Sequence, residues 1–246
     1  MKKAVFVVSD LHFGCDTRVS SYARENIFLR FLERTTPSCR ELIVLGDLFD
    51  FWFEYRRATD KRLVRFLSEW KSRMDGIPVS LFCGNHDAWH ADFLAEFMGA
   101  EIVPGPQTRT LFGRRFHFAH GDGLGRGDVG YKILKKTLRN RAVVTLFRTL
   151  HPDFGWTLGD SVSETRRNAR KMEYVNSLPD DHPLVEYSRT LFQRDPDLHA
   201  AVYGHLHCLK RLTLENRTIF VLGDWIKYFS FLKICEHGEE LCQYAD

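Results

Sequence analysis

The chain has 246 residues, a length that fits one large α/β domain or a domain carrying an insertion. Its 44% hydrophobic content is ordinary for a globular protein, and a net charge of +3 gives no indication of nucleic-acid binding. The apolar run at 4–8 is too short for a signal peptide or a membrane span. We therefore expect a cytoplasmic protein whose six cysteines are free thiols.

Strand-like and helix-like segments alternate over the first hundred residues. Apolar, β-rich runs predict three strands, at 4–8, 42–45 and 79–83. Apolar residues at helical spacing predict three helices, at 21–33, 60–74 and 91–98. Strands that alternate with helices in this way predict parallel neighbours in one sheet.

A second group of strands is expected in the last part of the chain. Further apolar runs predict strands at 116–119 and 200–203. Beyond these lie four more strand-like segments joined by tight turns, at 210–214, 218–222, 228–235 and 240–244.

Residues 128–193 separate the two groups of predicted strands, and their apolar residues recur at helical spacing. We therefore predict that 128–193 form a helical cap, inserted into a core made of 1–127 and 194–246. Asp128 can cap a first helix, which His151-Pro152 and Phe154-Gly155 are expected to break. Two more helices are expected from Asp160 to about Val175 and from Pro183 to Phe192.

The cap is basic in its first two thirds. Residues 128–171 hold ten basic and four acidic residues, a net charge of +6 that leaves −3 for the rest of the chain. Each single charge could be a solvated helix face, but the asymmetry favours a surface for an anionic substrate or anionic lipid headgroups. Interspersed apolar residues such as Phe147, Leu150, Phe154 and Trp156 suit an amphiphilic partner.

Five polar motifs follow the predicted strands, always in the place where a buried strand ends. They are Asp10-Leu11-His12, Gly46-Asp47, Gly84-Asn85-His86-Asp87, His120-Gly121-Asp122 and Gly204-His205-Leu206-His207. Asp, Asn and His supply the oxygen and nitrogen donors that Mn, Fe, Co and Zn accept. Residues i and i+2 of an extended chain face the same side, so the D-x-H and H-x-H pairs can converge on one centre. We interpret the set as a two-metal hydrolytic site.

In this order the motifs resemble those of the calcineurin-like metallophosphoesterases: D-x-H, G-D, G-N-H-[DE], H-G and G-H-x-H. The resemblance runs from Asp10 to His207 and implies a four-layered α/β fold, a β-sandwich flanked by helices. It also implies two divalent ions, with Mn expected and Fe, Co or Zn open. The first ion would be held by Asp10, His12 and His207, the second by Asn85, His120 and His205, with Asp47 as the bridge. Such a pair supplies charge neutralisation and a water nucleophile for phosphate ester hydrolysis.

The same resemblance gives His86 a separate role, beside the expected catalytic residues Asp47 and Asn85. In the family this histidine contacts the phosphate as an electrostatic stabiliser or as a proton donor to the leaving oxygen. Asp87 and Asp122 are candidates for orienting the ligand histidines.

Four further segments resemble the UDP-2,3-diacylglucosamine pyrophosphatases of bacterial lipid A synthesis. They are residues 46–52 (GDLFDFW), 120–124 (HGDGL), 128–131 (DVGY) and 221–225 (VLGDW). The resemblance implies a nucleotide-diphosphate glycolipid as substrate, at the inner membrane surface. Asp128 and Tyr131 would contact its glucosamine or phosphate part. Four basic residues would lie near the diphosphate or the membrane: Arg166, Arg167, Arg170 and Lys171.

One position departs from that subfamily, because well-known members have G-N-R-D where this chain has His86. The departure leaves open a soluble phosphodiesterase or nucleotide phosphatase with the same centre. A metal-free scaffold is a third reading, which the complete ligand set disfavours. The aromatic run at 49–55 could line a substrate site or simply belong to the core.

Overall fold

The computed structural model describes residues 3–127, 129–163 and 178–245. A six-stranded sheet has the order β11-β10-β1-β2-β3-β4. Its four parallel strands are β1 (Ala4–Val8), β2 (Cys39–Val44), β3 (Val79–Phe82) and β4 (Glu101–Val103). The hairpin of β10 (Ser230–Cys235) and β11 (Gly238–Gln243) joins β1 in antiparallel orientation. The predicted parallel order of the first strands is confirmed.

A five-stranded sheet has the order β5-β6-β7-β9-β8. Its strands are β5 (Gln107–Leu111), β6 (Arg114–Ala119), β7 (Leu198–Tyr203), β8 (Leu209–Leu214) and β9 (Arg217–Leu222). Strands β6, β7 and β9 are parallel, while β5 and β8 pair in antiparallel orientation at the two edges.

The two sheets pack face to face on a shared apolar core. Val5 and Val7 of β1 point into this interior, where they meet residues of the second sheet such as Phe118 and Val202. The alternate residues of β1 point the other way, into a second core under the helices. Strand β1 is therefore buried on both faces, which explains its unbroken apolar sequence.

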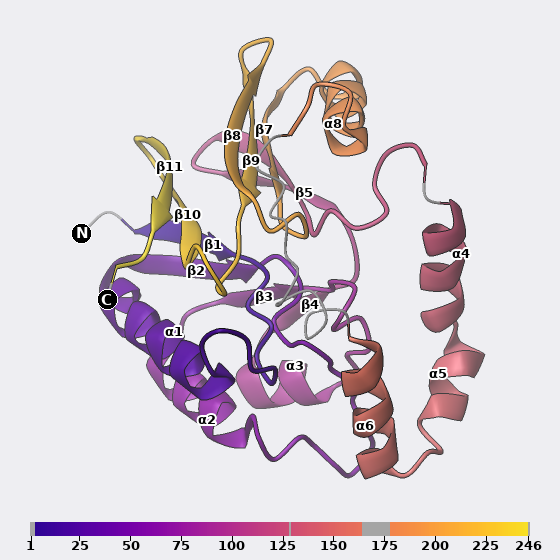
Figure 1. Cartoon of the computed structure of the whole chain (residues 1–246). Coiled ribbons are helices and arrows are strands. Elements are labelled where there is room, and N and C mark those ends of the chain that lie inside the picture. The colour runs from indigo at the N-terminus through magenta and orange to yellow at the C-terminus, as the bar shows by residue number, and fades with distance from the viewer. Residues whose placement is uncertain (1–2, 128, 164–177, 246) are drawn as a thin grey trace.

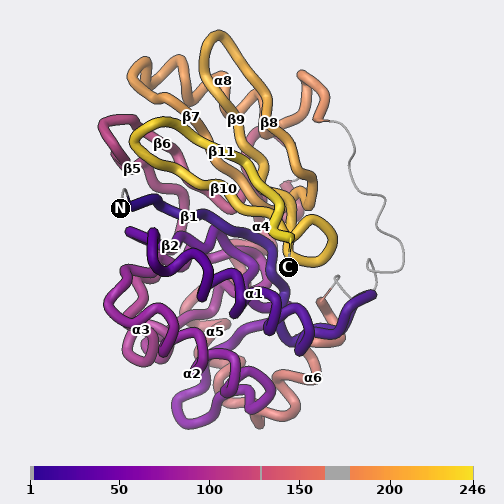
Figure 2. Tube along the Cα trace, turned by 90° about the vertical axis from the view of Figure 1, so that its left-hand side faces the viewer, coloured from indigo at the N-terminus to yellow at the C-terminus, as the bar shows by residue number. Residues whose placement is uncertain are grey.

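Helices cover the outer face of each sheet, which completes four layers (Figure 1). Helices α1 (Ser21–Thr35), α2 (Val64–Arg73) and α3 (Phe93–Met98) lie on the first sheet, with the short 3₁₀ turn η1 (Thr36–Ser38) after α1. Helix α8 (Pro183–Arg194) lies on the second sheet at the opposite end of the molecule (Figure 2). The predicted sandwich flanked by helices is confirmed.

Three cap helices stand beside the sandwich on one side (Figure 1). They are α4 (Val129–Leu138), α5 (Arg141–Phe147) and α6 (Pro152–Val162). The expected break at His151-Pro152 is confirmed, because His151 caps α6 ahead of Pro152. The expected break at Phe154-Gly155 is wrong, because both residues lie inside α6. The chain also breaks at Asn140, whose side chain caps α5.

The remaining cap predictions have mixed outcomes. Most of the helix expected from Asp160 to Val175 lies outside the described residues, but α6 ends at Val162 and Ser163 is not helical. The helix expected at 183–192 is confirmed as α8, and its buried Leu184, Val185 and Phe192 pack on the second sheet. This last part of the expected insertion thus forms a layer of the sandwich. Strands β4 and β5 were not predicted.

Candidate metal centre

All five motifs lie at the carboxyl ends of parallel strands, where β1, β2, β3, β6 and β7 bring them to one edge of the sandwich. Main-chain hydrogen bonds hold neighbouring loops together: the amides of Leu11 and His12 donate to the Asp47 carbonyl at 2.9 and 3.0 Å. The Gly204 amide donates to the His120 carbonyl at 2.9 Å. The predicted convergence of the motifs is therefore present in the fold.

The loop backbones adopt a conformation that non-glycine residues rarely accept. Positive φ angles occur at five of the seven expected ligands, namely Asp10 (56°), His12 (48°), Asp47 (52°), His205 (67°) and His207 (48°). Left-handed backbone at non-glycine residues persists where surrounding contacts enforce it, and it concentrates at functional sites. The clustering of these angles on one set of side chains supports a functional origin.

Two motif glycines are required by close packing against the expected ligands. A Cβ atom on Gly84 would lie 2.0 Å from Asp47 Oδ1, and one on Gly204 would lie 2.7 Å from Asp10 Oδ2. No side chain fits at either position without displacing a carboxylate. The glycines of G-N-H-D and G-H-x-H thus let two loops approach the carboxylates.

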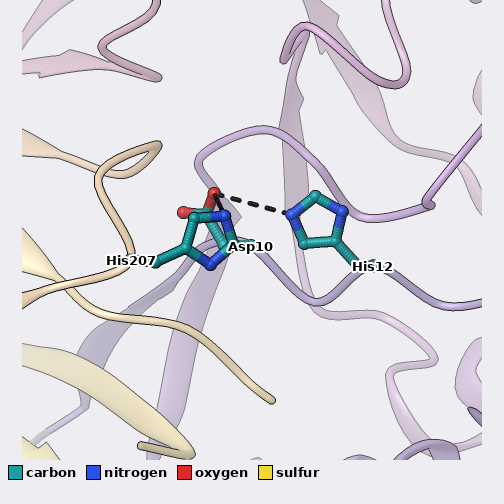
Figure 3. Close-up of side chains that lie close together, drawn as sticks. All are labelled: Asp10, His12 and His207. Atoms are coloured by element: carbon teal, nitrogen blue, oxygen red, sulfur yellow. Dashed lines mark ion pairs between the residues drawn. The ribbon is translucent and has the colours of Figure 1, made fainter. Parts of the chain in front are cut away.

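Asp10, His12 and His207 form the first group of side chains (Figure 3). The two imidazoles approach the same carboxylate oxygen, with Asp10 Oδ1 lying 3.8 Å from His12 Nε2 and 3.5 Å from His207 Nε2. Asp10 is fully buried, and its Oδ1 accepts no hydrogen bond within the described parts of the chain. A buried carboxylate oxygen faced by two imidazole nitrogens fits a shared cation.

Asp47 and His120 form a second group together with Asp10. Asp47 Oδ2 lies 3.3 Å from His120 Nε2 and 3.6 Å from His12 Nε2, so one carboxylate oxygen faces both groups. Asn85 Oδ1 lies 3.1 Å from the same nitrogen of His120. This position between the two sets is the one expected of a bridging ligand. The ligand roles themselves stay predictions.

His205 stands slightly apart from these groups. Its ring centroid lies 5.2 Å from that of His120, and its main-chain amide donates to Asp10 Oδ2 at 2.8 Å. The ring faces the cavity described below. Burial and the neighbouring His120 lower the pKa of His205 to about 4, which keeps its imidazole neutral and able to ligate.

Charges within the centre balance through protonated histidines. Burial raises the pKa of Asp10, but His207 and His12 outweigh it and hold this pKa at about 2. Burial lowers the pKa of His12, but the nearby carboxylates of Asp10 and Asp50 outweigh it and raise this pKa to about 10. A divalent cation at this place would supply the positive charge that protons supply here.

Three of the expected ligand histidines point Nε2 towards the metal centre, and in each of them a residue outside the ligand set contacts Nδ1. His120 Nδ1 donates to the Leu45 carbonyl at 2.8 Å. His12 Nδ1 lies 3.3 Å from Asp50 Oδ1, and His207 Nδ1 lies 3.2 Å from Asp224 Oδ2. Outer partners of this kind orient metal-ligating imidazoles.

The expected orienting residues, Asp87 and Asp122, contact other groups. Asp87 accepts main-chain hydrogen bonds from Gly84, Asp47 and Leu48, so it fixes the loops rather than an imidazole. Asp122 pairs with Tyr131 and Lys135 of α4. That prediction is wrong. Asp50 and Asp224 were missed because their contacts with His12 and His207 are formed only by the folded loops.

His86 lies at the edge of the centre with its ring partly open to the cavity. Its Nδ1 donates to the Asp50 carbonyl at 2.7 Å, which leaves Nε2 directed inward, 4.0 Å from Asp47 Oδ2. Its amide also donates to Asp47 Oδ1 at 2.9 Å. This geometry suits a proton donor or phosphate contact, a role that stays a prediction.

The family model described as calcineurin-like phosphoesterase matches residues 3–209. The chain belongs to this family. Its Asp and His cluster and its family together make it a metal-dependent phosphoesterase.

Curated relatives match this phosphoesterase over almost its whole length. The UDP-2,3-diacylglucosamine hydrolase of Porphyromonas gingivalis is 28% identical and covers 94% of both chains. The enzyme of the same name from Haemophilus influenzae strain PittGG is 28% identical, covering 97% of this chain and 98% of its own. Among solved structures, the Escherichia coli phosphoesterase Yfce is 12% identical with a TM-score of 0.45, covering 94% of this chain and 87% of that one.

A cavity of about 460 Å³ connects the centre of the phosphoesterase with its cap. Asn85, His86 and His205 line one side. Residues of α4, α6 and a neighbouring loop line the other, among them Trp89, Tyr131, Leu134, Lys135, Leu138, Arg139 and Val162. A substrate bound here would touch both the expected ligands and an apolar wall.

Polar contacts anchor α4 over this cavity. Tyr131 donates to Asp122 Oδ2 at 2.7 Å, and Lys135 pairs with the same oxygen at 2.6 Å. Arg139 donates to the Gly84 carbonyl at 2.8 Å. Tyr131 lines the cavity, and its contact with a substrate stays a prediction. Lys135 and Arg139 were counted in the basic segment but not assigned to the site.

Two more residues predicted to bind substrate, Asn85 and His86, also line the cavity. The remaining predicted substrate residues lie outside the described residues: Asp128, Arg166, Arg167, Arg170 and Lys171. The aromatic run divides between the two readings offered for it. Phe49 and Trp52 stack on each other in the core, whereas Phe51 lines the cavity.

Proposed function

We propose that this phosphoesterase hydrolyses the diphosphate of UDP-2,3-diacylglucosamine, releasing UMP and 2,3-diacylglucosamine 1-phosphate for lipid A synthesis. We propose further that it uses two Mn ions and works at the cytoplasmic face of the inner membrane. The observation that carries the proposal is the cavity, which joins a metal-binding wall to an apolar, basic wall. Relatives bearing the name of this activity match nearly the full chain.

The core residues account for the chemical half of the proposal. Asp10, His12 and His207 would hold one ion, and Asn85, His120 and His205 the other, with Asp47 between them. Divalent ions held there would neutralise the phosphoryl charge and supply a water nucleophile at neutral pH. His86 would protonate the leaving oxygen or contact the phosphate through Nε2.

The cap accounts for the substrate half. Lys135 and Arg139 offer positive charge beside the apolar wall formed by Leu134, Leu138 and Val162. A diphosphate could pair with the cations, and acyl chains could cover the apolar side chains. Asp128 and Tyr131 would contact the sugar or its phosphate. Arg166, Arg167, Arg170 and Lys171 would add charge near the diphosphate or the membrane.

Exposed apolar side chains on the cap support a location at the membrane surface. Six of them are more than half exposed: Val129, Ile133, Leu134, Leu146, Phe154 and Val162. Clusters of this kind mark lipid or protein contacts, and basic neighbours favour anionic headgroups. Among the residues that the structure describes, none of the helices combines the length and apolarity that crossing a bilayer requires. Peripheral attachment through α4–α6 is the proposal that fits.

The test is product analysis with UDP-2,3-diacylglucosamine, with Mn and with a chelator. We expect UMP and the 1-phosphate in equal amounts, and only when Mn is present. An enzyme that releases no UMP but cleaves a small chromogenic phosphodiester would instead be a soluble phosphodiesterase of the same family. Washed membranes provide a second test, because a lipid enzyme should bind them and dissociate at high salt.

A further inference from the structure

Asp50 lies between the metal centre and the cap and contacts both. It follows the expected bridging residue Asp47 by three positions and is 3% exposed. Its amide donates to the Phe13 carbonyl at 2.9 Å, which joins its loop to the loop of His12. Sequence patterns gave it no role.

On the inner side, Asp50 fixes two histidines of the centre. Its Oδ1 lies 3.3 Å from His12 Nδ1, and its main-chain carbonyl accepts the 2.7 Å hydrogen bond from His86 Nδ1. The two rings lie edge to face, with centroids 4.8 Å apart. One residue therefore sets the orientation of an expected ligand and of the expected proton donor.

On the outer side, the second carboxylate oxygen accepts a hydrogen bond from the cap. The Ser163 hydroxyl donates to Asp50 Oδ2 at 2.5 Å, and Ser163 is only 6% exposed. Ser163 is the first residue after α6, and its amide still donates to the Gly159 carbonyl at 2.9 Å. The position of its hydroxyl is thus tied to the end of the helix.

Helix α6 itself is seated tightly on the core. A Cβ atom on Gly159 would lie 2.3 Å from the Phe51 ring, and one on Gly155 would lie 1.7 Å from the Tyr55 hydroxyl. Beside Gly159, Asp160 pairs with Arg62 at 3.1 Å, and Arg62 also binds Asp60. These contacts give α6 one close-fitting position.

We infer that Asp50 is a positioning residue that couples the seating of α6 to the orientation of His12 and His86. Both carboxylate oxygens are used, one by the cap and one by the centre. If the Ser163 hydroxyl were removed, the buried Oδ2 of Asp50 would lose this donor. The carboxylate could then rotate towards a different donor. The imidazole of His12 would then lose its fixed orientation. The inference rests on the proposed metal centre but not on the identity of the lipid.

The test compares Ser163→Ala with Thr157→Ala, a control on the same helix. Thr157 is exposed, and its hydroxyl donates to the Asp153 carbonyl within α6. Two quantities are measured: the Mn affinity by equilibrium binding, and kcat and KM for a small chromogenic phosphodiester. For Ser163→Ala we expect each of Mn affinity and kcat to fall roughly 10-fold, as loss of an orienting contact does. KM for the small ester should stay near the wild-type value.

Two more variants separate positioning from general damage. Ser163→Thr keeps the hydroxyl and should restore most of both losses. Gly159→Ala should displace α6 from Phe51 and reproduce them by another route. The inference is overturned if Ser163→Ala keeps its Mn affinity and kcat as Thr157→Ala does. It is also overturned if Thr157→Ala loses as much Mn affinity and kcat as Ser163→Ala. Failure of the lipid assay would leave this result unaffected, because neither readout uses the lipid.

Discussion

The motif loops and the cap helices form the two walls of one cavity, yet they are built in opposite ways. In the loops, Asp10, His12, Asp47 and His120 are at most 4% exposed, and left-handed backbone is held by hydrogen bonds between loops. In the cap, α4 and α5 bury no residue fully, and apolar side chains point to solvent. The difference favours a rigid wall for chemistry and, at α4 and α5, a more adaptable wall for the proposed lipid substrate.

The largest effect is expected at the carboxylate shared by both ligand groups. Asp47→Ala removes the residue that faces His12 and His120, so bound metal and kcat should fall by orders of magnitude on every substrate. Metal analysis and steady-state kinetics provide the measurement. The control is Asp75→Ala, which removes an exposed carboxylate and should change neither. A variant that kept its metal would show that Asp47 is not the bridge.

His86→Ala should act on the chemical step and spare the metals. Its Nδ1 is fixed by Asp50 while Nε2 faces inward, so kcat should fall by roughly 10²–10⁴ if it donates the proton. The loss should be equal for the lipid and for a small phosphodiester. His237→Ala, at an exposed turn, is the matched control. An unchanged kcat would reduce His86 to a structural neighbour.

Arg24 tests how far the rigid wall depends on its support. This fully buried guanidinium donates to the carbonyls of Leu11, His12 and Cys15, which clamps the D-x-H loop to α1. Arg24→Met leaves these carbonyls without their donor and should lower folding stability by about 3 kcal/mol. It should also lower the affinity for Mn. Urea unfolding gives the first quantity. The exposed Arg34→Met, on the same helix, should cost no more than about 0.5 kcal/mol.

The smallest and most selective effect is expected on the cap. Leu146 and Phe154 are 71% and 58% exposed, so changing both to Gln should leave folding and metal content intact. Losing their contact with lipid should raise KM for the glycolipid about 10-fold, with no change for a small phosphodiester. Equal changes in KM for both substrates would contradict the proposal that the cap binds the lipid while the motif loops carry the chemistry.

The sequence predicted the rigid wall better than the adaptable one. Ligand-type residues at the ends of apolar strands could be recognised because i, i+2 spacing and strand order are local properties. The roles of Asp50 and Asp224 could not, because each meets its histidine only through tertiary packing. The expected break at Phe154-Gly155 failed for a related reason. Gly155 lies inside α6 and packs against Tyr55, which leaves no room for a larger side chain, so this glycine serves helix packing rather than a turn. Strand β5 was missed because its sequence, QTRTL, is mostly polar at a sheet edge.

The most direct test of the account is the number of metal ions bound by the purified protein after Mn reconstitution. Asp10, His12 and His207 form one group, and Asp47 joins it to His120 and Asn85, so the account predicts two ions per chain. Activity should rise with the second equivalent. One ion or none, in protein that is folded and active, would contradict the two-metal centre.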